Sequence, residues 1–124
     1  MLNEYRLEAG AAVNLTELPL RFEVLPGNEV REGAPATGLC EIDAGPGLDI
    51  GVWHMTEGTA VDVEEDECFV VLTGRATVMI EAGDSGEART LELAPGTLGR
   101  LVAGMKTVWI VHESLRKLYL SPVA

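Results

Sequence analysis

The sequence lacks a membrane-spanning stretch and carries little positive charge. Apolar residues make up 47% of its 124 residues, but no uninterrupted apolar run approaches the roughly 20 residues that a transmembrane helix needs. Nine Lys and Arg stand against twenty Asp and Glu, which gives a formal net charge of −11. A surface of this sign repels phosphate backbones and anionic lipids. We therefore expect neither nucleic acid nor a membrane as a partner, and expect a small molecule or another protein instead.

Cysteine is scarce as well. Cys40 and Cys68 are the two cysteines, too few and too widely spaced for a disulfide framework or for a zinc site of paired thiols. We predict that both are buried thiols, because Cys68 opens the apolar run that ends at Leu72. The first residues show no basic cluster followed by an apolar stretch, so the expected location is the cytoplasm.

Helical periodicity is hard to find, whereas short runs of β-forming residues recur at intervals of roughly 8 to 12 residues. This spacing predicts a β-sandwich or β-barrel. The predicted strands cover residues 20–25, 37–42, 49–55, 67–72, 76–81, 89–93, 107–112 and 116–120. Turns are expected at 26–28, 45–47, 84–86 and 95–96, because Gly, Pro, Asn and Asp supply the backbone angles that turns require. Residues 69–72 are apolar on both faces, which predicts a strand covered on both sides.

The chain has no internal repeat, low-complexity segment or long linker, and we predict one domain. Residues 1–36 would form an N-terminal arm with the first strand, and residues 37–124 the barrel. The apolar residues within 1–19 fit either a short helix or an arm that crosses a partner subunit, and their spacing does not decide between the two.

Two stretches resemble the motifs of a known superfamily. Gly51-Val52-Trp53, followed by residues 66–78, is similar to the first motif of the cupins. Pro95-Gly96, followed by residues 102–109 and 116–119, is similar to the second. The resemblance covers residues 37–120 and points to the branch with (S)-ureidoglycine aminohydrolase-like and ethanolamine-utilisation-like proteins. It implies an all-β, RmlC-like jelly-roll barrel, a double-stranded β-helix of two antiparallel sheets, and a homodimer.

The resemblance also implies that the usual metal ligands are missing. In metal-binding cupins the first motif supplies two histidines separated by one residue, then a glutamate, then a glycine. Glu67 and Gly74 match the last two positions, but the histidine positions fall on Val61 and Val63, and that of the second motif falls on Thr107. A transition metal needs three or four converging N, O or S donors, and valine has none. We predict a site without a metal and without another cofactor.

The cupin barrel implies a shared inward side, which defines the candidate binding residues. These are Val61, Val63, Glu67, Phe69 and Val71, facing Thr107, Trp109 and Val111, with Trp53 beside them. Glu67 is the leading candidate for general acid or base work in this apolar pocket. The alternative is a structural Glu67, bonded to a backbone donor or to Arg75. The aromatic residues either stack on a planar ligand or fill the core, for which a small barrel needs large side chains.

His54 is the second catalytic candidate, because related branches more often resemble Trp-Glu where this sequence has Trp53-His54. Facing inward, it would pair with Glu67 as a proton acceptor or supply a metal ligand. Facing outward, it is a surface residue. Strand alternation gives Trp53 and His54 opposite faces, and His112 is expected outside. The acidic run 64–66 is expected to be a solvated turn, since adjacent strand residues cannot converge on one ion.

Three functions remain open from the sequence. The first is a metal-independent cupin that binds a small nitrogen-containing or neutral metabolite around Glu67, Thr107 and Trp109. The second is an aminohydrolase-like or isomerase-like enzyme that uses Glu67 with His54. The third is a structural module in which exposed strands pair two subunits. Dimerisation is compatible with all three.

Overall fold

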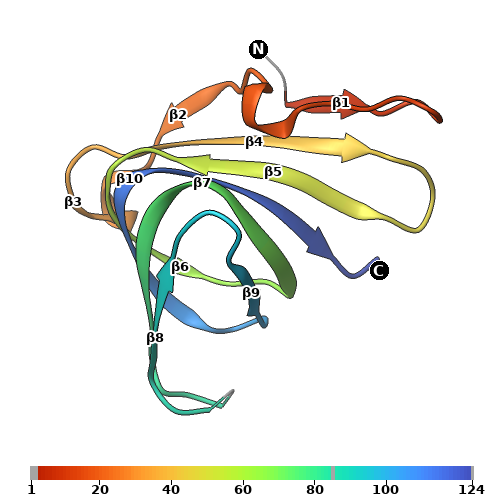
Figure 1. Ribbon diagram of the computed structural model, residues 1–124. Coiled ribbons are helices and arrows are strands. Elements are labelled where there is room, and N and C mark those ends of the chain that lie inside the picture. The colour runs from red at the N-terminus through yellow and green to blue at the C-terminus, as the bar shows by residue number, and fades with distance from the viewer. Residues whose placement is uncertain (1–2, 85, 124) are drawn as a thin grey trace.

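The computed structural model describes residues 3–84 and 86–123, and almost all of its regular structure is β-strand (Figure 1). The elements are β1 Glu4–Arg6, β2 Phe22–Val24, β3 Val30–Glu32, β4 Ala36–Asp43, β5 Asp49–Met55, β6 Gly58–Val63, β7 Glu67–Ile80, β8 Arg89–Leu93, β9 Leu98–Leu101 and β10 Lys106–Ser121, with 3₁₀ turns η1 Leu15–Glu17 and η2 Gly27–Glu29. No α-helix occurs in this part of the chain, so the all-β prediction is confirmed. Within the described ranges, no helix has the length and apolar character to cross a membrane.

Two long strands, β7 and β10, organise the fold. They pair with each other along most of their length and bend, so that each contributes to two layers (Figure 1). In one layer the strand order is β1-β4-β5-β10-β7-β9, with β2 also paired to β4. In the other layer the order is β3-β6-β10-β7-β8. The sheet is therefore an open jelly roll with two packed faces.

The bends in β7 and β10 correct one part of the sequence prediction. Residues 67–72 and 76–81 were expected as separate strands, as were 107–112 and 116–120, but each pair forms one continuous strand. The register shifts between Val111 and Lys117, and such bulges bend a strand and increase its twist. Gly74 has a φ of +87°, and a Cβ there would clash with the backbone of β10 at Ser114 and Leu115. Glycine thus marks a bend within β7.

The main core lies between the two layers. It comprises Met55, Ala60, Phe69, Val71, Ala76, Val78, Ile80, Leu93, Leu101, Trp109, Val111 and Leu115. Burying a large apolar side chain contributes roughly 1.5–3 kcal/mol each, so this cluster is the chief source of stability. The inward facing predicted for Phe69, Val71, Trp109 and Val111 is confirmed by their burial.

The N-terminal segment forms a second core on the outer face of β4 and β5. Leu18 and Leu20 pack there with Cys40, Ile42 and Val52. β1 runs parallel to β4, and η1 begins at Asn14, whose side chain accepts from the Thr16 N–H at 3.0 Å. Residues 3–19 therefore pack against their own chain and contain one 3₁₀ turn and no α-helix, so the short helix is wrong there, whereas an arm that crosses a partner subunit remains a prediction. Residues 1 and 2 of the arm lie outside the described residues.

Two local predictions have mixed outcomes. Cys40 is fully buried as predicted, but Cys68 is exposed, so that prediction is wrong. Phe69 points into the core, and Cys68, its neighbour in the strand, therefore points outward. The turn expected at 84–86 includes Ser85, which lies outside the described residues. Gly83 and Gly86 on either side exchange backbone hydrogen bonds of 2.9 and 3.0 Å.

Candidate functional site

A cavity of about 300 Å³ opens on the inner face near the carboxyl ends of β6 and β10. Its lining residues come from β4, β5, β7, β10 and the end of β6 with the loop that follows. They are Leu39, Trp53, Asp62, Val63, Glu64, Glu65, Glu67, Trp109, Lys117, Tyr119 and Ser121. Four of these are carboxylates and one is a lysine, so the cavity is rich in hydrogen-bond acceptors.

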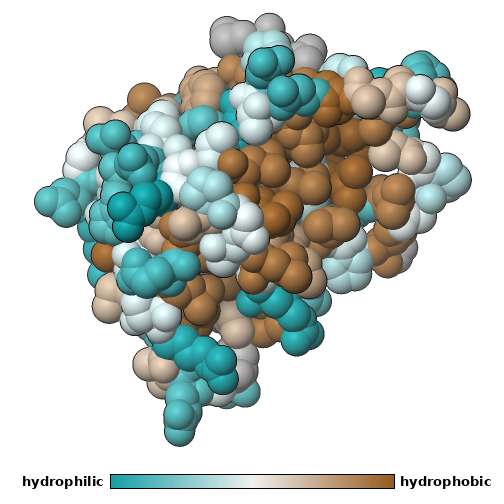
Figure 2. Space-filling model, viewed as in Figure 1, coloured by the Kyte–Doolittle hydropathy of each residue, from teal (hydrophilic) through white to brown (hydrophobic). Residues whose placement is uncertain are grey.

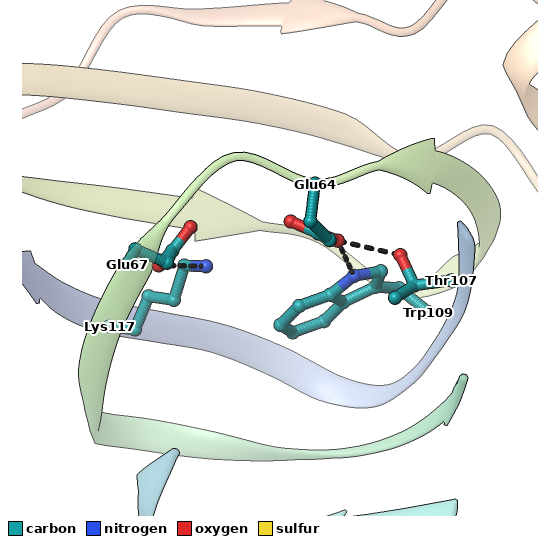
Figure 3. A network of polar contacts seen from close by, with 5 residues as sticks. All are labelled: Glu64, Glu67, Thr107, Trp109 and Lys117. Carbon is teal, nitrogen blue, oxygen red and sulfur yellow. Dashed lines mark hydrogen bonds and ion pairs between the residues drawn. The ribbon is translucent and has the colours of Figure 1, made fainter. Parts of the chain in front are cut away.

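Lys117 lies at the centre of this site. Its Nζ is 2.9 Å from Oε2 of Glu67, and the two side chains are 5% and 15% exposed. The same nitrogen sits 4.8, 4.7 and 4.8 Å from the ring centroids of Trp53, Phe69 and Trp109. Register explains the placement, because Lys117 on β10 is directly opposite Trp53 on β5, and directly opposite residues share a face. Figure 3 shows the ammonium reaching the Glu67 carboxylate.

Glu64 forms the second polar group of the cavity. It is 5% exposed, and its Oε2 accepts from the Thr107 hydroxyl at 2.6 Å and from the Trp109 indole N–H at 3.0 Å (Figure 3). Backbone bonds with Met105 and Gly104 fix the Glu64 peptide against the loop before β10. The expected solvated turn is therefore wrong for Glu64, because inward donors from β10 compensate its burial.

Asp62 and Tyr119 complete the polar lining. Asp62 lies opposite Thr107 in the β6–β10 register. Its pKa is raised, chiefly by burial and then by the neighbouring charge of Glu64, while the hydrogen bond from the Val63 N–H opposes the rise. Burial and nearby carboxylates raise the pKa of Tyr119 to about 12. The phenol therefore stays protonated at neutral pH and remains a possible donor to a ligand.

The structure brings most of the predicted site residues together, but not the two valines. Trp53, Glu67, Phe69, Thr107 and Trp109 converge around Lys117 and Glu64. The other two of the seven predicted binding residues, Val61 and Val63, do not face inward.

The inward facing predicted for Val61 and Val63 is wrong because the register differs by one residue. Ala60 lies opposite Trp109, whereas Val61 lies opposite Val108 and Val63 opposite Lys106. A shift of one residue moves a side chain to the other face of a strand. Val63 is 60% exposed, although it still lines part of the cavity.

His54 lies on the opposite face of β5 from Trp53. Its Nδ1 accepts from Nε of Arg116 at 2.9 Å, and Nη1 of Arg116 donates to the carbonyls of Leu15 and Leu18, each at 2.8 Å. Burial and the Arg116 charge lower the pKa of His54 to about 4. The predicted acid–base pair of His54 and Glu67 is therefore not assembled.

The contacts of His112 and Glu67 bear on two further expectations. His112 is exposed, as predicted, and its Nε2 lies 2.9 Å from the Thr77 hydroxyl. Glu67 is not bonded to Arg75, which is exposed, but to Lys117. Sequence reasoning missed Lys117, Glu64 and Asp62. The one available signal was the alternation of β10, which places Lys117 on the same face as Tyr119. In the register these two residues lie opposite Trp53 and Gly51 of β5, respectively.

The residues present do not fit the transition metal that metal-binding cupins hold. In the parts of the chain that the structure describes, no three His, Cys, Asp or Glu side chains gather as a metal site. Moreover, the cation beside Glu67 is an ammonium group of the protein itself, and a metal ion at the same carboxylate would meet its repulsion.

Solved structures of other proteins share this fold. EutQ of Clostridium difficile superposes with a TM-score of 0.58 at 22% identity, covering 73% of this chain and 64% of the other, so this chain spans less than two thirds of that protein. A putative ethanolamine utilization protein Q of Salmonella typhimurium gives 0.55 at 18% identity, covering 84% and 95%. Oxalate decarboxylase of Bacillus subtilis gives 0.56 at 16% identity, covering 76% and 27%.

These likenesses show that other proteins share the jelly-roll fold, and the match to a cupin family model confirms the predicted superfamily. No curated protein matches the sequence. The sequence profile of the EutQ-like cupin domain, however, matches residues 46–119, more than half of the chain. The chain belongs to the EutQ-like cupin family.

Proposed function

We propose that this protein binds a small nitrogen-containing metabolite in its cavity, without a metal. The observation that carries the proposal is the acceptor-rich lining, in which four carboxylates and two indole rings surround a space of about 300 Å³ and the one lysine is already paired with Glu67. That volume suits a small molecule. The complementary ligand donates hydrogen bonds, as N–H groups do.

Glu64 is the residue that we expect to orient the ligand. Both of its hydrogen bonds go to Oε2, which leaves Oε1 able to accept from a bound N–H group. Thr107 and Trp109 hold the carboxylate in one position, so its geometry is set before the ligand arrives. Pre-organised groups of this kind strengthen binding because less ordering remains to be done. The net charge of −11 also attracts a positively charged ligand.

A thermal-shift panel tests the proposal. Ethanolamine is a natural first probe, since one similar structure is that of a putative ethanolamine utilization protein, and ethylene glycol is its match without nitrogen. A ligand that binds only the folded state raises the melting temperature in proportion to RT ln(1 + [L]/Kd). We expect at least one amine, amide or guanidine to stabilise the protein and its neutral match to do so less.

Variants then locate the effect. Glu64→Gln should remove most of the ligand-induced shift, whereas Glu57→Gln, on an exposed turn, should leave it unchanged. The proposal fails if no nitrogen compound shifts the wild type, or if the two variants respond alike. The enzyme that we considered with Glu67 and His54 has no support from the geometry, since these side chains lie on opposite faces of the layer.

We also propose that two copies pair through the outer face of β7, β9 and β10. Val70 lies beside Leu98 and Leu118 in the strand register, and Leu120 is next to this row. Leu98 and Leu120 are 73% and 43% exposed, and Figure 2 shows a continuous brown area where β5, β10 and β7 run in Figure 1. An apolar face is where two copies that each carry a net charge of −11 meet with least repulsion.

Sedimentation velocity tests this pairing. We expect a dimer for the wild type and a monomer for the double variant Leu98→Lys with Leu120→Lys. The control variant Met79→Lys should remain a dimer, because Met79 is 48% exposed and lies outside this row. A monomeric wild type would refute the homodimer. The cytoplasmic location expected from the sequence remains a prediction.

A further inference from the structure

The environment of the Lys117 ammonium is that of a bound cation. Three aromatic rings surround Nζ at 4.7 to 4.8 Å, and one carboxylate oxygen accepts from it at 2.9 Å. The rings come from three different strands, with Trp53 on β5, Phe69 on β7 and Trp109 on β10. Trp53 and Trp109 also pack edge to face, with centroids 5.3 Å apart, so two of the three rings of this aromatic cage contact each other.

This arrangement compensates a large desolvation cost. An ammonium group that is 5% exposed has lost most of its water, and an unpaired buried charge is strongly unfavourable. Ring faces attract cations, tryptophan most of all, and the attraction is greater when water is excluded. Glu67 supplies the opposite charge. Together these groups replace the hydration shell of a primary ammonium ion.

We propose that the floor of the cavity is a binding site for a primary alkylammonium group and that Lys117 is its built-in occupant. The site is therefore separate from the ligand position at Glu64, and the proposal does not depend on the function proposed above. It follows that shortening Lys117 to alanine would vacate the site without removing the cage. A free alkylammonium ion of the missing length would then bind there.

Propylammonium is the matched probe, because Lys117→Ala removes three methylene groups and the ammonium beyond Cβ. The control compound is 1-propanol, which has nearly the same size and no charge. The control variant is Lys106→Ala, since Lys106 and Lys117 are the two lysines of the chain and Lys106 is exposed. Melting temperature and tryptophan fluorescence report binding, the latter because two cage residues are tryptophans.

We expect propylammonium to stabilise Lys117→Ala more than it stabilises Lys106→Ala or the wild type, in which only the position at Glu64 is open. It should bind the vacated site roughly tenfold more tightly than 1-propanol, the factor that a desolvated cation–π contact of this kind supplies. Equal binding of the two compounds, or no binding of propylammonium to a folded Lys117→Ala, would overturn the proposal.

The wild type provides a test that does not depend on the variant folding. The three rings should shift the ε-methylene protons of Lys117 upfield of those of Lys106 in the NMR spectrum, and an acylating reagent should modify Lys106 long before Lys117. If Lys117→Ala is unfolded, refolding in propylammonium but not in 1-propanol supports the proposal. Equal proton shifts and equal acylation of the two lysines would refute it. Thermal shifts of the wild type by ethanolamine bear only on the function proposed at Glu64.

Discussion

Arg116 and Lys117 are neighbours in β10, and both are buried, yet their side chains lie on opposite faces of the sheet. The groups that compensate the buried charge differ between the two. Lys117 points inward and has a carboxylate and three rings as partners. Arg116 points outward under the N-terminal segment, where its partners are neutral, namely two carbonyls and the His54 ring.

The difference shows what each cation does. Arg116 joins segments, because its planar donors reach Leu15, Leu18 and His54 at once. Its pKa is lowered by burial, but a guanidinium remains charged. Lys117 is a point charge, and its compact ammonium group fits a cage. On one face of β10, Arg116 therefore attaches the N-terminal segment to the sheet, and on the other face Lys117 forms the floor of the cavity.

The largest effect is expected from Lys117→Met, which keeps the length of the side chain but removes its charge. Glu67, 15% exposed, would lose its partner, and breaking a buried ion pair from one side costs about 3–5 kcal/mol. Urea unfolding measures the loss. Lys106→Met should change stability by less than about 0.5 kcal/mol, as exposed substitutions do. A loss below about 1 kcal/mol for Lys117→Met would show that the pair contributes little.

Arg116→Met should destabilise by about 2–3 kcal/mol, because two carbonyls lose a charged donor. Unlike Lys117→Met, it should also speed proteolysis of the N-terminal segment, which Arg116 fastens to the sheet. Limited proteolysis with urea unfolding checks both effects, with Arg89→Met at the exposed start of β8 as the control. An intact segment that resists cleavage as in the wild type would contradict the fastening.

Acidification should lower the free energy of unfolding, because protonated His54 can no longer accept the hydrogen bond from Arg116. The folded state holds the pKa of His54 at about 4, below its ordinary value of 6.5, so the unfolded chain binds this proton more readily. The stability from neutral His54 is complete above pH 6.5 and is lost as the pH falls from 6.5 to 4. The expected loss is about 2 kcal/mol, after reduction by solvent screening of the half-buried ring.

The control for this pH dependence is His54→Gln, which offers Arg116 an acceptor and does not titrate. Melting temperatures measured between pH 7 and pH 4 should fall more steeply for the wild type than for the variant. Parallel curves would mean that His54 protonation is not coupled to folding.

The smallest effect is expected from Thr107→Val, which removes one of the two donors to Glu64 at nearly constant volume. Loss of this hydrogen bond should cost about 1 kcal/mol, since Trp109 still donates. Thr90→Val, at an exposed position on β8, is the control in urea unfolding. An unchanged Thr107→Val would indicate that Trp109 alone holds the carboxylate.

The fold was more predictable than the site because different physical features encode them. Alternation and turn residues predicted β5 and β8 with their observed bounds, and the cupin motifs predicted the jelly roll. The continuity of β10 was not predictable, since a bulge at 113–115 looks like a turn in the sequence.

The site depended on register, which no local pattern in the sequence reveals. A displacement of one residue placed Val61 outside and Ala60 inside. Glu64 looked solvated because its donors, Thr107 and Trp109, are more than forty positions away in the chain. Lys117 was missed because lysine is usually exposed, and only the meeting of β5, β7 and β10 creates its cage.

The way in which β7 and β10 cross from one layer to the other has a consequence for unfolding. Because β7 and β10 belong to both layers, one layer cannot unfold while the other remains folded. Amide hydrogens of the two layers should therefore exchange with one common opening free energy in native-state experiments. The short β1, paired only at one edge of the sheet, is where independent fraying should begin.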